Sequence, residues 1–168
     1  MFCWDTHLTK IKGRNVLFIV NASSRYTIAM TDIEPRNWNY YAMYIRSVIH
    51  GVMQEMGYFE EQIGQYFKMP GDTAVTKTHG RKSVGGINRM VMDAQYFGKK
   101  LEKEAKYQWE LSEYLNRYIC QPEGFDAYGY PSELFKLDME RLGIAAKRKP
   151  AKVIDIAQYI ENNRGTND

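Results

Sequence analysis

The hydrophobic period of this 168-residue chain changes at Pro35, and that change constrains the fold more than any other feature. Before it, the stretch FCWDTHLTKI alternates with a period of two, so Trp4 lies on one strand face while Asp5 and His7 lie on the other. VLFIVN is a continuous apolar run typical of a central strand, and RYTIAMTDI has the composition of a third strand. Residues 2–32 therefore predict a three-stranded antiparallel meander.

After Pro35 the apolar residues recur at every third or fourth position, which is the pattern of amphipathic helices. Such helices are predicted over 37–56, 58–68, 84–101 with a continuation through 119, and 131–143. A short strand near 74–79 is expected to join the sheet. The predicted class is α+β, a small antiparallel sheet packed against four to six helices.

Residues 1–145 are expected to form a single domain, followed over 146–168 by a basic linker and an amphipathic helix or arm. The net charge of +3 is mildly basic and does not by itself indicate a nucleic-acid partner. Neither a signal peptide nor an apolar run of membrane-spanning length is recognisable, which favours a cytoplasmic protein without a membrane partner. Cys3 and Cys120 are expected to be reduced thiols, and the oligomeric state is left open.

The segment AVTKTHGRKSVGG, residues 74–86, gathers cations around one histidine. The stretch 76–106 holds eight Lys or Arg and three Asp or Glu, an excess larger than the net charge of the whole chain. The segment also leads into a predicted helix start with Ser83 as N-cap, where free N–H groups favour an anion. This pattern predicts a phosphate site at residues 77–86, with a solvated basic loop as the alternative.

A second polar cluster, NASSRY, separates the second and third predicted strands. The forked guanidinium of Arg25 suits a phosphate, and Tyr26 could stack on a base, although an ordinary hairpin turn would use the same residue types. If the two clusters meet in space, the candidate catalytic residues are His7, Arg25, Lys77, His79 and Arg81. The candidate nucleic-acid-binding residues are Trp4, Tyr26, Lys82, Ser83, Arg89, Lys99 and Lys100.

This set of residues matches the needs of RNA cleavage without a metal ion. The 2′-hydroxyl attacks the adjacent phosphate while one histidine removes its proton and a second acid protonates the leaving oxygen. Lysine and arginine stabilise the charge that develops on the phosphate. The three histidines and two scattered cysteines lack metal-ligand spacing, so neither a metal nor a cofactor is predicted.

The pattern WDTHL…GR…LFIVNASSRY, followed about fifty residues later by TKTHGRKSVGGINR, resembles a bacterial and mobile-element domain family over roughly residues 2–100. That family carries a Trp-x-x-His strand, an Asn-x-x-Ser-Arg-Tyr turn and a Thr-Lys-Thr-x-x-Arg-Ser segment. Here Lys82 is an extra residue within the last motif. The chain is also similar to plasmid- or phage-borne anti-CRISPR proteins directed at type II systems, one group of which truncates the guide RNA.

The resemblance implies endonucleolytic truncation of guide RNA, with the guide RNA and a type II effector nuclease as partners. Its site residues would be His7, Arg25, Lys77, His79 and Arg81. Two alternatives stay open: a non-enzymatic binder that blocks guide loading or the nucleic-acid groove, and a toxin-like or regulatory RNA-binding domain.

Overall fold

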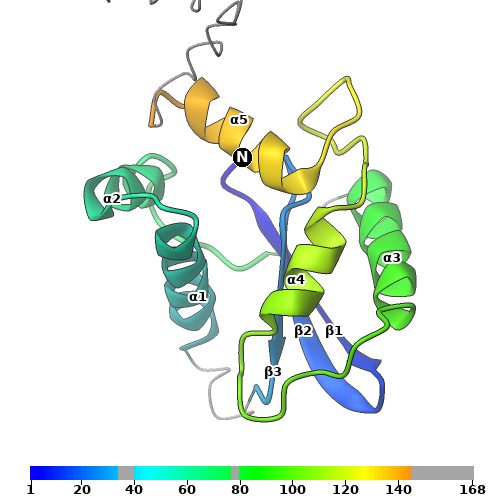
Figure 1. The fold of residues 1–168 in the computed structure, drawn as a ribbon. Coiled ribbons are helices and arrows are strands. Elements are labelled where there is room, and N and C mark those ends of the chain that lie inside the picture. The colour runs from blue at the N-terminus through cyan, green and yellow to red at the C-terminus, as the bar shows by residue number, and fades with distance from the viewer. Residues whose placement is uncertain (34–39, 77–79, 145–168) are drawn as a thin grey trace, which may run out of the picture.

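A computed structural model describes residues 1–33, 40–76 and 80–144 of the chain (Figure 1). Two candidate site residues, Lys77 and His79, lie outside the described residues. So does the C-terminal arm predicted at 146–168.

The sheet is a meander of three antiparallel strands in the order β1 (Trp4–Ile11), β2 (Arg14–Asn21) and β3 (Thr27–Thr31), as predicted. β1 and β2 are joined by a tight turn in which Lys12 and Gly13 have φ values of 50° and 83°. Such left-handed pairs match the twist of two-residue hairpin turns. Arg25, predicted to lie in the third strand, belongs instead to the turn before β3 and has a φ of 60°.

Helices cover both faces of the sheet, which explains why β2 is apolar at every position from Val16 to Val20 (Figure 1). Leu17 and Ile19 pack in a core shared with three helices, α1 (Tyr41–Glu55), α2 (Glu60–Lys68) and α5 (Pro131–Arg141). Phe18, on the opposite face, packs in a core shared with α3 (Arg81–Gln95) and α4 (Trp109–Asn116). The described residues thus form the predicted α+β fold, with five helices.

Three details differ from the sequence predictions. The helix predicted through residue 119 is two helices, because the chain between α3 and α4 leaves helical geometry to pair with β3. Residues 74–76 of the predicted fourth strand form irregular structure. Ser83 is not the N-cap: α3 begins after Gly80, and Ser83 lies in its first turn.

The open edge of β3 is hydrogen-bonded by α4 and the residue before it. Asn116 accepts from the Thr27 N–H and donates to the Thr27 carbonyl, both at 2.8 Å. The Ser112 hydroxyl accepts from the Ala29 N–H at 2.9 Å, and the backbone N–H of Gln108 donates to the Ala29 carbonyl at 2.9 Å. An edge strand presents unpaired backbone groups, so these side chains take the place of a fourth strand.

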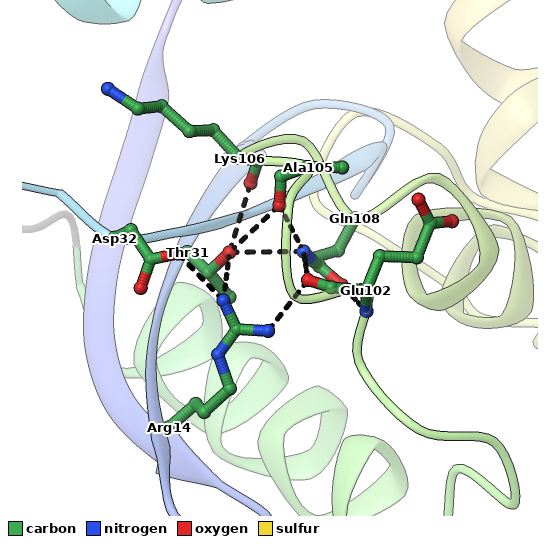
Figure 2. A network of polar contacts seen from close by, with 7 residues as sticks. All are labelled: Arg14, Thr31, Asp32, Glu102, Ala105, Lys106 and Gln108. Carbon is green, nitrogen blue, oxygen red and sulfur yellow. Dashed lines mark hydrogen bonds and ion pairs between the residues drawn. The ribbon is translucent and has the colours of Figure 1, made fainter.

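Gln108 also fixes the loop between α3 and α4 (Figure 2). Its buried amide donates to the Thr31 hydroxyl and to the carbonyls of Glu102 and Ala105. Arg14, in turn, donates to the Glu102 carbonyl and forms an ion pair with Asp32, both at 2.7 Å. The loop carrying Lys99 and Lys100 is therefore held at the β1–β2 hairpin end of the sheet.

Candidate phosphate-binding site

The turn before β3 meets the first half of α3 at one close contact. The Arg25 guanidinium lies over Gly86, so closely that a Cβ built on Gly86 would be 2.6 Å from Cζ of Arg25 and 3.1 Å from its Nε. Glycine is the residue type that leaves room for this approach. The structure thus brings together parts of the two polar segments that the sequence suggested could meet.

Arg25 and Arg89 line a hollow of about 130 Å³ between α3, the end of α4 and the start of α5. Arg89 is paired with Asp93 at 3.3 Å. The half-buried Arg25 guanidinium has neither a hydrogen-bond acceptor nor an ion-pair partner among the described residues. Its charge reaches Cys120: burial raises the pKa of that thiol, and Arg25 opposes the rise. The hollow therefore offers a fixed, unneutralised cation in a space suited to one small anion.

One helical turn before Gly86, Ser83 donates a 2.5 Å hydrogen bond to the Asp5 carboxylate. Asp5 is only 5% exposed. A buried carboxylate is costly unless it is hydrogen-bonded or paired, so this contact explains why a serine stands on the sheet-facing side of α3. It also fixes the start of α3 against β1, which sets the position of Gly86 under Arg25.

His7 lies on β1 between two contacts with α3, those of Asp5 with Ser83 and of the Lys10 carbonyl with Gln95 at 3.0 Å. Gln95, which faces β1, and Arg89, which lines the Arg25 hollow, point about 120° apart around the helix. The side of α3 that meets β1 and the side that lines the hollow are therefore different, and His7 is not among the residues that line the hollow. The described residues do not place this histidine beside the cation.

The predicted cations outside the hollow fall into two groups. Arg81, a predicted catalytic residue, and Lys82 are exposed on the first turn of α3. Lys99 and Lys100 follow the opposite end of that helix, and Lys99 is paired with Glu110 at 2.6 Å. The two loop lysines therefore come after Asp93, which lines the Arg25 hollow near the end of α3.

Trp4 and Tyr26, predicted to contact bases, have different surroundings. Tyr26 is 4% exposed and packs on Phe135 in the core, so its ring has no open face for a base. Burial also raises its pKa. Trp4 is half-buried, donates to the Tyr66 hydroxyl at 2.9 Å, and lines a cavity.

That cavity, of about 420 Å³, lies between β1, α1, α2 and the loop before α3, and the sequence analysis missed it. It contains the aromatic rings of Phe2, Trp4, Tyr41, Tyr66 and Phe67 together with Arg46. The sequence signal for this cavity was weak. Arg46 is one position from the apolar stripe of α1, and an arginine in that position is commonly just solvated.

The described residues contain neither a metal-binding cluster nor a membrane-spanning helix. No group of three His, Cys, Asp or Glu side chains there could hold a metal ion. Nor is any described helix long and apolar enough to cross a bilayer.

Fold and site together define a small α+β protein with a sheet between two helical layers and a cationic hollow where a strand turn meets a helix. The chain belongs to the family described as a domain of unknown function, DUF6933, whose model matches residues 1–134. The matched region contains the whole sheet, α3 and the Arg25 hollow. Comparisons with curated proteins and with solved structures gave no match.

Proposed function

We propose that the protein binds RNA through a phosphate site centred on Arg25, and that this RNA is the guide of a type II CRISPR effector, which the protein inhibits. The observation that carries the proposal is the Arg25 guanidinium, which is held over Gly86 and unneutralised among the described residues. A forked cation fixed in this way matches two oxygens of a phosphodiester. The choice of guide RNA rests on the resemblance to inhibitors of these effectors.

The activity we propose for the site is truncation of the guide RNA without a metal ion. The 2′-hydroxyl oxygen bonds to phosphorus, the bond to the 5′-oxygen breaks, and a 2′,3′-cyclic phosphate forms. A base accepts the 2′-hydroxyl proton and an acid supplies one to the 5′-oxygen. Arg25 stabilises the charge on the phosphate in between. The buried Asp5–Ser83 pair supports this activity, since it is a titratable group one helical turn from the Gly86 over which Arg25 lies.

A second candidate is inhibition by binding alone, in which the protein covers the guide RNA and leaves it intact. The position of His7 favours this reading, since that side chain is not among the residues that line the Arg25 hollow. The described residues thus offer a phosphate contact without a histidine next to it.

The phosphate site is tested by titrating single-stranded RNA against the protein at several salt concentrations. Each phosphate contact on a single strand contributes about 0.7 to the slope of log K against log salt. Arg25→Ala should lower the slope by that amount and weaken binding about tenfold. Arg117→Ala is the matched control, because it removes the same charge from an exposed site directly after α4. Equal slopes for wild type and Arg25→Ala would contradict the proposed site.

The activity is tested on a denaturing gel of guide RNA incubated with the protein in EDTA, with and without the type II effector. A discrete shortened RNA that Arg25→Ala no longer produces would support cleavage. Intact RNA in every lane, together with blocked effector cutting, would support inhibition by binding. Intact RNA with a fully active effector would contradict both candidates.

A further inference from the structure

We propose that the cavity between β1, α1 and α2 is a nucleobase-binding site, which takes one unstacked base while Arg46 at its mouth contacts the phosphate of that nucleotide. The inference rests on the proposed function in one respect: the base belongs to the RNA that is bound at Arg25. The volume of about 420 Å³ lies within the range of small-ligand pockets.

The aromatic walls of the cavity are fixed by contacts among themselves. Trp4 Nε1 donates to the Tyr66 hydroxyl at 2.9 Å, and Tyr66 donates to the Met1 carbonyl at 2.9 Å. Trp4 also meets Phe135 edge to face, with ring centroids 5.7 Å apart. Because the polar tips of Trp4 and Tyr66 are satisfied inside the protein, the walls are rigid and need no ligand to order them. Tyr66 is 2% exposed and only supports the wall, whereas the half-buried Trp4 ring is available to a base. A preorganised ring of this kind stacks on a base at little entropic cost.

Arg46 gives the mouth of the cavity its charge. The guanidinium carbon lies 4.5 Å from the centroid of the Phe67 ring, and Nη1 is 3.5 Å from the Thr73 hydroxyl. A guanidinium stacked on a ring is held flat, so its outer face can stack on a base while the N–H groups at its edge donate to a phosphate. An exposed arginine fixed at the mouth of an aromatic cavity favours an anionic ligand with a flat apolar part.

Polar groups on the lining distinguish a base from a plain hydrocarbon. Thr6, Asp72 and Thr76 contribute to the wall alongside the rings. The Asp72 carboxylate is exposed, and covering it with a hydrocarbon, which offers no hydrogen bond, is costly. A nucleobase carries donors and acceptors around its edge and apolar faces above and below, so it suits a cavity with both kinds of wall.

The cavity lies on the α1–α2 face of the sheet, and the Arg25 hollow lies on the α3–α4 face. The edge strand β1 connects them: Asp5 lines the cavity and accepts the hydrogen bond of Ser83, which is one helical turn from the Gly86 that supports Arg25. An RNA strand that fills both sites would pass around the edge of the sheet at β1, so the base and the phosphate belong to different nucleotides.

The test uses the four ribonucleoside monophosphates as probes, titrated into the full chain and followed by NMR chemical shifts. Ala42 lines the cavity, so Ala42→Phe should fill it and weaken binding of the monophosphates about tenfold. Met43→Phe is the control, because residue 43 is 69% exposed and is not part of the lining. Arg46→Gln should weaken binding of a monophosphate more than binding of the corresponding nucleoside.

Two results would overturn the inference: unchanged monophosphate binding in Ala42→Phe, or tighter binding of indole and phenol than of any nucleoside. Its failure can be separated from failure of the phosphate site. RNA binding that depends on Arg25 but not on Ala42→Phe rejects the nucleobase site alone. The opposite pattern is that Ala42→Phe abolishes monophosphate binding while Arg25→Ala leaves RNA binding unchanged. That result would reject the phosphate site and support the nucleobase site.

Discussion

Arg25 is positioned by the absence of a side chain at Gly86. The guanidinium occupies the volume that a β-carbon would fill, since such an atom would lie 2.6 Å from the guanidinium carbon. Arg25 reaches this place from a left-handed backbone conformation with a φ of 60°, which is uncommon outside glycine, asparagine and aspartate. Two local features thus combine to hold one cation over α3.

Gly86→Ala should therefore displace the Arg25 side chain. We expect RNA binding to weaken as much as in Arg25→Ala, with the same loss of about 0.7 in the salt slope. The helix itself should tolerate the change, because alanine is the better helix former by about 1 kcal/mol. Salt-dependent RNA titration, together with a far-UV spectrum, measures both effects.

Gly85→Ala is the control for this experiment. A β-carbon at Gly85 meets nothing within 4 Å, so the variant should gain helix stability and keep wild-type RNA binding. Wild-type binding by Gly86→Ala would show that the contact does not position Arg25 for RNA.

Ser83→Ala should destabilise the fold by removing the hydrogen bond to the buried Asp5 carboxylate. Losing a bond to a charged, buried group costs about 1–3 kcal/mol. Urea denaturation at pH 7 measures the loss, and Ser47→Ala, which removes an exposed hydroxyl from α1, is the matched control. If Ser83→Ala and Ser47→Ala unfold at the same urea concentration, the Asp5 contact does not contribute to stability.

The meander and the helical layers were predictable because they follow from hydrophobic period. β2 is apolar at every position from Val16 to Val20, and the structure buries it on both faces. The Arg25–Gly86 contact could be predicted from the sequence only in part. Residue types suggested that the two segments could meet, but the left-handed turn that aims Arg25 has no hydrophobic signature.

Other features of the structure could not be predicted from the hydrophobic periodicity of the sequence. Gln108, Ser112 and Asn116 recur at spacings of four, so they share one side of α4, and each is 2% exposed or less. Polar residues at helical spacing usually indicate a solvated face. Here they meet the backbone of β3, and only the tertiary arrangement reveals that partner. The aromatic cavity was hidden for the same reason, since its walls come from three separate elements.

Asn116→Leu should reopen part of the β3 edge. The Thr27 N–H and carbonyl would both lose their partner, at a cost of about 2–4 kcal/mol if water does not replace it. Asn88→Leu, at an exposed position on α3, should change stability far less. Urea denaturation gives the free-energy difference, and hydrogen exchange at Thr27 localises it. Unchanged exchange at Thr27 would contradict the role assigned to Asn116.

Asp138 is a buried carboxyl whose protonation should stabilise the fold in acid. The residue is 2% exposed on α5, and among the described residues its Oδ2 has no hydrogen bond of ordinary geometry. Burial raises the pKa of this carboxyl above 3.8, and Ser23 and Arg141 offset the rise only in part. A raised carboxyl pKa means that the folded state binds the proton more tightly than the unfolded chain. The stabilisation is therefore complete below pH 3.8 and is lost as the pH rises through the folded-state pKa.

Asp138→Asn removes this titration while keeping the shape of the side chain. At pH 7 the variant should unfold at a higher urea concentration than wild type, because it no longer buries a charge. The difference should shrink as the pH falls and disappear below pH 3.8, where wild type is neutral as well. Asp126→Asn, at an exposed position, is the control, and it should not differ from wild type in this pH-dependent way. A variant that is less stable than wild type at pH 7, but equal to it in acid, would mean that the charged form is the one the fold stabilises through Arg141.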